Sequence, residues 1–166
     1  MSKSYRRLFI ILVLLVITPC WVAAAAWTRQ NSGTMAWLHS VYFLNQNVGW
    51  VAGSNGTLLF TNDSGQTWHK MRRPTEDSLR DVYFSDEHNG WLVCDREVYK
   101  LKTENEPQAY LLRTNDGGAT WSRVDLSDSN TRVLRAVFRP DGRGWTFGEA
   151  GALYATSDGG PGLRNH

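Results

Sequence analysis

Three aspartates recur in nearly the same local sequence: Asp63, Asp116 and Asp158. Each stands in the pattern Ser or Thr, any residue, Asp, any residue, Gly. Such carboxylates act either as metal ligands or catalytic acids, or as acceptors for backbone N–H groups of their own turn. We favour the turn role, because one active site does not need an acid in every repeat. The turns also lack the dense acidic spacing of a calcium loop.

The residues after each aspartate fit a structural turn called an Asp box. The glycine two positions later tolerates positive φ, and the Trp five positions later is expected to open a strand and pack against the sheet. In the third copy, Leu163 stands where the Trp would be. The structural Asp-box positions are Asp63, Gly65, Trp68, Asp116, Gly118, Trp121, Asp158 and Gly160.

Other reactive chemistry is not indicated. The four His residues have no metal-ligand spacing, and there is no nucleophile elbow, P-loop or Cys-x-x-Cys motif. Cys94 would be the single cysteine left after removal of a segment that contains Cys20, so no internal disulfide is expected. The sequence therefore predicts no enzyme activity, no metal and no cofactor.

The Asp boxes belong to longer repeats. Leu79 begins the second repeat 41 residues after Leu38 begins the first, and we align Leu134 with both as the start of a third. A period near 41 suits a four-stranded propeller blade. We expect blades at about 38–73, 79–126 and 134–163, a hairpin insertion at 95–109, and a stray outer strand at 27–34 that completes the last blade.

These repeats define the predicted fold class. It is all-β: a partial propeller of about three four-stranded antiparallel blades within residues 27–166, preceded by an N-terminal signal or anchor helix. No stretch after residue 27 has a sustained helical period of apolar residues.

Residues 1–26 have the three-part plan of a secretory signal peptide. A basic start precedes the apolar run Leu8–Ile17, and small residues lead to cleavage after Ala26. An uncleaved anchor formed by residues 8–27 is the alternative. A lipoprotein would use Cys20, but the residues before it make a poor lipobox. We expect export to the periplasm, the extracellular space or the thylakoid lumen.

Removal of residues 1–26 would leave 15 basic and 16 acidic residues. The formal net charge of +2 therefore comes from the signal segment, and no bulk basicity indicates a nucleic-acid partner.

The repeat sequences resemble the photosystem II stability/assembly factor family of Asp-box propellers. The resemblance rests on Gly49-Trp-Val-Ala-Gly53, on Thr61-Asn-Asp-Ser-Gly-Gln-Thr-Trp68 and on the segment from Trp27 to Thr34. It implies a non-catalytic, exported scaffold that binds a protein partner, a subunit of a membrane complex. Members of the family usually have about seven blades, so three repeats are a departure.

Candidate partner-binding residues are Arg80, Arg135 and His39. Arg80 and Arg135 follow the first Leu of their repeats, and His39 holds that place in the first repeat. The resemblance places this position near one mouth of the propeller channel, where basic side chains would meet an acidic partner. The alternative is that these arginines are solvated or paired with neighbouring acids such as Asp81.

Three further alternatives stay open. Self-association of copies would complete the propeller, because three repeats cannot close a ring. A sialidase-like or carbohydrate-binding fragment is a second, since sialidases also carry Asp boxes. A shortened propeller with no function of its own is the third.

Overall fold

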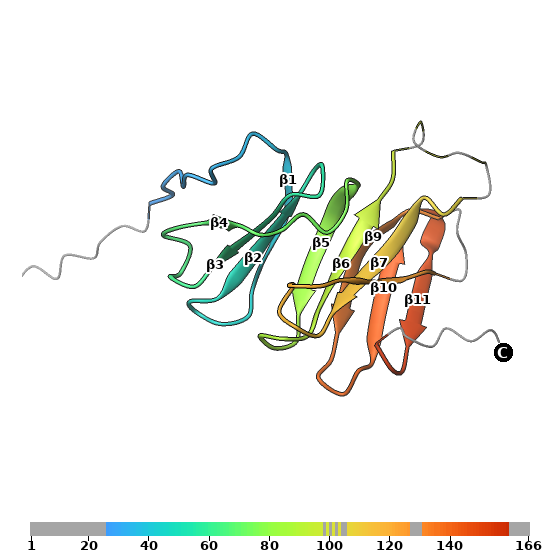
Figure 1. The fold of residues 1–166 in the computed structure, drawn as a ribbon. Helices are drawn as coiled ribbons and strands as arrows, with labels where there is room; N and C mark the ends of the chain where they lie inside the picture. The colour runs from blue at the N-terminus through green and yellow to red at the C-terminus, as the bar shows by residue number, and fades with distance from the viewer. Residues whose placement is uncertain are drawn as a thin grey trace, which may run out of the picture.

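The computed structural model describes residues 26–97, 99, 101, 103, 106–126 and 131–159. Three antiparallel sheets follow one another along the chain and pack side by side (Figure 1). The first sheet contains β1 (Leu38–Phe43), β2 (Gly49–Gly53), β3 (Leu58–Thr61) and β4 (His69–Lys70). The second contains β5 (Ser78–Phe84), β6 (Gly90–Asp95), β7 (Ala109–Thr114) and β8 (Ser122–Val124). The third contains β9 (Val133–Phe138), β10 (Gly144–Gly148) and β11 (Leu153–Thr156), with the short helical turn η2 (Glu149–Gly151) before β11.

The predicted all-β class is confirmed, and the sheets have the form of propeller blades. Each sheet is a meander in which neighbours in sequence pair with each other. The first strands of the sheets lie together, since β5 contacts both β1 and β9. The predicted N-terminal helix lies outside the described residues. Among residues that are described, no helix is long and apolar enough to cross a membrane.

The Gly-Trp pair at the start of each second strand explains how the sheets are joined. Gly49, Gly90 and Gly144 lie opposite a Phe of the first strand, and a Cβ atom on Gly90 would come within 2.5 Å of the Phe84 ring. The glycine therefore leaves space for the ring against the backbone. In the first two sheets, the Trp that follows this glycine stacks on the Phe of the next sheet.

Two such Trp–Phe stacks hold the three sheets together. Trp50 lies 3.7 Å from Phe84, and Trp91 lies 4.0 Å from Phe138, measured between ring centroids, with the rings nearly parallel. All four rings are buried. Burial of aromatic surface of this size is a main source of stability in a small β protein.

Our alignment of the third repeat was wrong by one residue. Phe43, Phe84 and Phe138 pair with the equivalent glycines, so Leu134 occupies the place of Arg80, and Arg135 occupies the place of Asp81. The position of Arg80 is a bulge at which the pairing register shifts. The bulged residue is His39 in β1 and Arg80 in β5. The Gly–Phe pairing fixes the register, whereas the Leu-Arg dipeptide that guided the alignment does not.

The expected outer strand at 27–34 is also not formed. These residues are loop, Trp27 is fully exposed, and the segment leads away from the sheets (Figure 1). The physical reason is that β11, the edge beside which the segment would pair, belongs to the third sheet, at the opposite end of the stack.

Candidate functional site

The Asp boxes form closed turns at one end of the sheets. The Thr61 hydroxyl donates to the Asp63 carboxylate at 2.7 Å, and the Thr67 backbone N–H donates to it at 2.9 Å. The Thr67 hydroxyl donates to the second oxygen. Gly65 has φ of +80°, which glycine adopts without a steric penalty.

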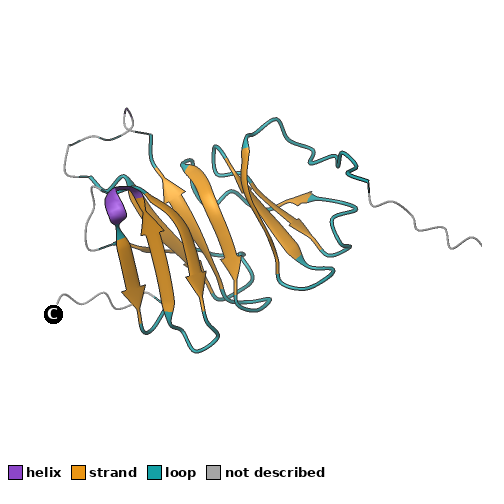
Figure 2. Cartoon of the chain, turned by 180° about the vertical axis from the view of Figure 1, so that it is seen from behind, coloured by secondary structure: helices purple, strands orange, loops and turns teal. Residues whose placement is uncertain are grey.

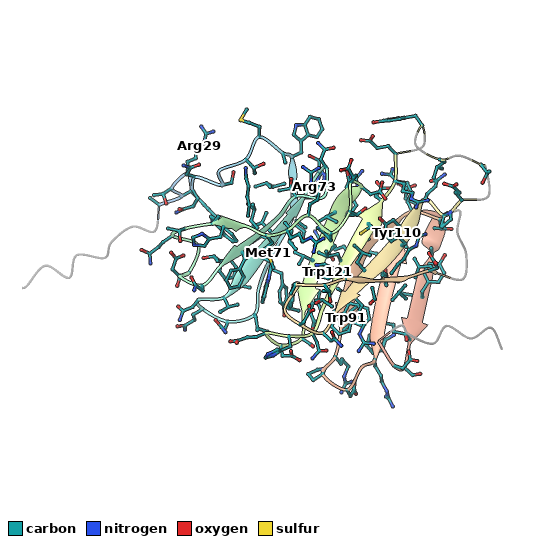
Figure 3. The ribbon with its side chains drawn as sticks, viewed as in Figure 1. Arg29, Met71, Arg73, Trp91, Tyr110 and Trp121 are labelled. Atoms are coloured by element: carbon teal, nitrogen blue, oxygen red, sulfur yellow. The ribbon has the colours of Figure 1, made fainter. Side chains whose placement is uncertain are left out.

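The second Asp box repeats this geometry. Asp116 accepts from the Thr114 hydroxyl at 2.7 Å and from the Thr120 backbone N–H at 2.9 Å, and Gly118 has φ of +92°. Trp121 is half-buried and donates from its indole nitrogen to the Gly118 carbonyl (Figure 3). Trp68 is also half-buried and meets Phe43 edge-on. In the third box, the Thr156 hydroxyl donates to Asp158 at 2.8 Å, and Gly160 lies outside the described residues.

These hydrogen bonds make the Asp-box carboxylates unsuited to catalysis. Donation from the Thr67 and Thr120 side chains and backbones lowers the pKa of Asp63 and Asp116 to about 2. Both groups are therefore ionised at neutral pH and cannot act as general acids. Nor do His, Cys, Asp and Glu side chains in the described part of the chain form a group of three that could hold a metal ion. The geometry favours the structural role.

Arg80 lies at the beginning of β5 and pairs with a buried acid. Its guanidinium donates to Asp95, the last residue of β6, at 2.7 and 2.8 Å, and one third of its side chain is exposed. His39 is half-buried. Partial burial and the nearby positive charge of Arg80 lower its pKa, so His39 is neutral at pH 7.

Arg132 also forms an ion pair with Asp95, and the sequence analysis did not identify this arginine as a site residue. Its guanidinium lies 2.6 Å from Asp95 and 3.3 Å from Glu149 of η2. The Glu149 backbone N–H also donates to the Arg132 carbonyl, which fixes η2 at the end of the third sheet where β9 begins (Figure 2). We call Arg80, Asp95, Arg132 and Glu149 the mouth cluster.

Arg135 lies apart from the mouth cluster and pairs with Asp81. The distance between its guanidinium and the Asp81 carboxylate is 3.6 Å, and 63% of the Arg135 side chain is exposed. Asp81 is buried and also accepts from the Ser40 hydroxyl at 2.6 Å and from the Ala136 backbone N–H at 3.1 Å. One carboxylate therefore connects the first strands of all three sheets.

The connection between β6 and β7 adds a second ion-paired group at this end of the sheets. Arg96 pairs with Asp77 at 3.4 Å and with Glu106 at 3.2 Å. The Tyr110 hydroxyl donates to Asp77 at 2.7 Å, and the Arg123 guanidinium lies 4.2 Å from the centre of the Tyr110 ring (Figure 3). These contacts tie the start of the connection to β7 and to the loop before β5.

The site thus presents three cations to solvent above two buried acids, and the exposed Glu149 carboxylate pairs with one of these cations, Arg132. Asp81 and Asp95 are buried, whereas the side chains of Arg80, Arg132 and Arg135 are between one third and two thirds exposed. Guanidinium groups bind carboxylates and carbonyls through forked N–H donors. The arrangement can therefore bind a polypeptide that carries such acceptors.

Comparison with known proteins identifies relatives. Residues 68–165 match the family model described as photosynthesis system II assembly factor YCF48. The photosystem II assembly lipoprotein Ycf48 of Synechococcus sp. (strain CC9902) is 26% identical over 145 residues, which cover 83% of this chain and 39% of that protein.

Two solved structures are similar in fold and sequence. YCF48 from Cyanidioschyzon merolae matches with a TM-score of 0.64 and 27% identity, over 83% of this chain and 39% of that one. A structure of YCF48 bound to D1 peptide matches with a TM-score of 0.62 and 27% identity, over 78% of this chain and 40% of that one. The chain spans about two fifths of the length of these relatives. Since the family model matches more than half of its residues, the chain belongs to the YCF48 family of photosynthesis system II assembly factors.

Proposed function

We propose that this chain is a non-catalytic, exported protein-binding scaffold that aids the assembly of a membrane complex. The observation that carries the proposal is the set of partly exposed guanidinium groups at the beginnings of β5 and β9, above the buried carboxylates of Asp81 and Asp95. The relative that was solved with D1 peptide supports a polypeptide segment as the partner.

The three arginines would act together on one extended segment. Asp95 fixes Arg80 and Arg132, and Asp81 restrains Arg135, so little side-chain freedom is lost when a partner binds. Their remaining N–H donors would bind carboxylate or carbonyl oxygens of the segment. His39 would add a neutral hydrogen-bonding group beside Arg80.

Export is part of the proposal. The basic, apolar and small-residue order of residues 1–26 supports it, and so do relatives named as lipoproteins. Those names also draw attention to Cys20, the residue to which a lipid anchor would be attached. Detection of the protein only in the cytoplasmic fraction of its host cell would contradict export.

A binding titration with a peptide tests the function. The D1 peptide of the solved YCF48 complex is added to the purified chain and to Arg132→Gln and Arg135→Ala variants, and heat of binding is measured. Each substitution is expected to weaken binding by about tenfold, which corresponds to roughly 1.4 kcal/mol.

Arg143→Ala is the matched control. Arg143 is an exposed arginine in the turn between β9 and β10, at the opposite end of these strands. Its loss should leave the affinity unchanged. Equal weakening by all three substitutions would show that binding depends on overall charge, and no binding to the unsubstituted chain would refute the proposed function.

A further inference from the structure

A small cavity lies at the outer edge of the joint between the first two sheets and shares no residue with the mouth cluster. Its volume is about 250 Å³. β4 and β8 are the last strands of their sheets, and four of the six lining residues are exposed, so the cavity opens to solvent. The lining residues are Arg72, Arg73 and Pro74 from the loop after β4, and Ala119, Thr120 and Trp121 from the second Asp box (Figure 3).

Hydrogen bonds hold both walls of the cavity in place. Where the loop begins, the Met71 backbone N–H donates to the Leu58 carbonyl at 2.9 Å. Near its end, the Thr75 hydroxyl lies 2.9 Å from the Tyr110 hydroxyl of the second sheet. The opposite wall is closed by the bonds to Asp116. The cavity is therefore formed by two packed sheets before any ligand arrives, so little ordering of the protein is needed for binding.

The side-chain donors left for a ligand are the two guanidinium groups. Thr120 already donates its hydroxyl and its backbone N–H to Asp116, at 2.6 and 2.9 Å. The Trp121 indole N–H donates to the Gly118 carbonyl at 3.1 Å. Arg72, by contrast, is exposed and forms no ion pair with any residue that the structure describes.

The second guanidinium has only a weak partner. Arg73 lies 3.5 Å from Glu76, and the two side chains are 55% and 88% exposed. An exposed pair of this kind contributes little free energy, so a ligand can replace Glu76. Lys70 of β4 is exposed and adds a third cation to the same edge. Three cations therefore stand against two acids, Glu76 and Asp116, and the balance of charge is positive.

We propose that this cavity binds a phosphate monoester, carried by a small soluble molecule or by a lipid headgroup. Such a group has a charge of about −1.5 to −2 at neutral pH, which matches two guanidinium groups better than a carboxylate does. The forked donors of Arg72 and Arg73 also fit phosphate oxygens in pairs. Pro74 and Trp121 provide an apolar wall for the body of the ester.

The size of the cavity supports a small ligand. Its volume of about 250 Å³ lies just below the range of ~300–1,000 Å³ typical of sites for drug-sized molecules. A phosphate with a short body fits this volume, whereas a polypeptide segment does not. The site is separate from the proposed peptide binding, and either can fail without the other.

Titration calorimetry with glycerol 3-phosphate tests the site. The unsubstituted chain should release or absorb heat on binding, and Arg72→Gln and Arg73→Gln should each weaken the affinity by about tenfold. Arg29→Gln is the matched control, because Arg29 is an exposed arginine in the segment before β1 and its loss changes the net charge equally (Figure 3). It should leave the affinity unchanged, and glycerol without phosphate should not bind.

Sedimentation with vesicles distinguishes the two sources of the phosphate. Vesicles of phosphatidylcholine with phosphatidate should carry the chain down, and Arg72→Gln should prevent this, if the ligand is a lipid. Binding to the soluble ester alone assigns a free phosphate monoester instead. The proposal is overturned if neither probe binds at up to about 10 mM phosphate, or if Arg29→Gln weakens binding as much as Arg72→Gln and Arg73→Gln do.

Discussion

At the scale of single residues, the Asp-box carboxylates use their acceptor positions within their own turns. Asp63 and Asp116 each accept two bonds from one Thr, through its backbone N–H and its hydroxyl, and a third from the Thr two residues earlier. Ionisation of each carboxylate therefore has a structural effect. The charged group accepts the hydrogen bonds that close the turn, and the closed turn positions the Trp that follows. This explains why an acid recurs in each repeat although the site at the other end of the sheets does not use it.

The low pKa of these carboxyl groups predicts how the stability of the fold changes at acidic pH. The pKa of Asp63 and Asp116 is about 2 in the folded chain, below the usual 3.8. Their contribution to folding is therefore complete above about pH 4 and is lost as the pH falls towards 2. Thermal melting between pH 2 and 7 should show this loss, and an Asp116→Asn variant should lose less stability over the same range. Glu87→Gln, a change to an exposed acid, is the control and should leave the acid dependence unaltered.

At the scale of elements, a large side chain of the first strand in each sheet faces a small residue of the second strand, in a fixed register. A Phe ring near the end of the first strand lies over a glycine of the second, and a bulge near the beginning of the first strand contains His39 in β1 and Arg80 in β5. The ring would have to move if the glycine gained a Cβ atom. Its freedom to move depends on whether the neighbouring sheet holds it.

Gly90→Ala and Gly49→Ala should therefore differ. At Gly90 the added methyl would meet Phe84, which Trp50 holds in place from the first sheet, and overpacking of this kind costs about 1–3 kcal/mol. At Gly49 the methyl meets Phe43, whose ring is exposed and can turn aside. Urea unfolding of both variants would measure the difference, and equal losses would contradict this explanation.

At the scale of the whole molecule, Asp81 links the first strands of the three sheets. It accepts from Ser40 in the first sheet and from the Ala136 backbone N–H in the third. Removal of this acceptor leaves a buried donor without its partner, which costs about 1–3 kcal/mol.

An Asp81→Ala variant should therefore be less stable by about 1–3 kcal/mol in urea unfolding. It should also lower the protection of the Ala136 amide against hydrogen exchange, because that amide loses its acceptor. Unchanged exchange at Ala136 would show that the link between the sheets does not depend on the carboxylate.

The sequence predicted the repeated sheets well and the site only in part. The Asp boxes and the Gly-Trp pairs are local signals, so the blade architecture could be predicted from the sequence alone. Arg135 was misaligned because a Leu-Arg dipeptide recurs one residue away from the position that the Gly–Phe pairing defines. Arg132 was missed because its link to Asp95 joins residues far apart in sequence, and no motif marks either of them. The role of Arg80, Arg135 and His39 in binding stays a prediction.

The joints between sheets have an evolutionary consequence. Each joint uses one Trp and one Phe at the same two repeat positions, so a gene that duplicates or deletes one whole repeat still encodes a Trp for every Phe. Such a change creates no buried mismatch and requires no compensating mutation elsewhere. Lineages of this architecture are therefore free to change in repeat number while the mouth cluster, which belongs to particular repeats, is retained or lost separately.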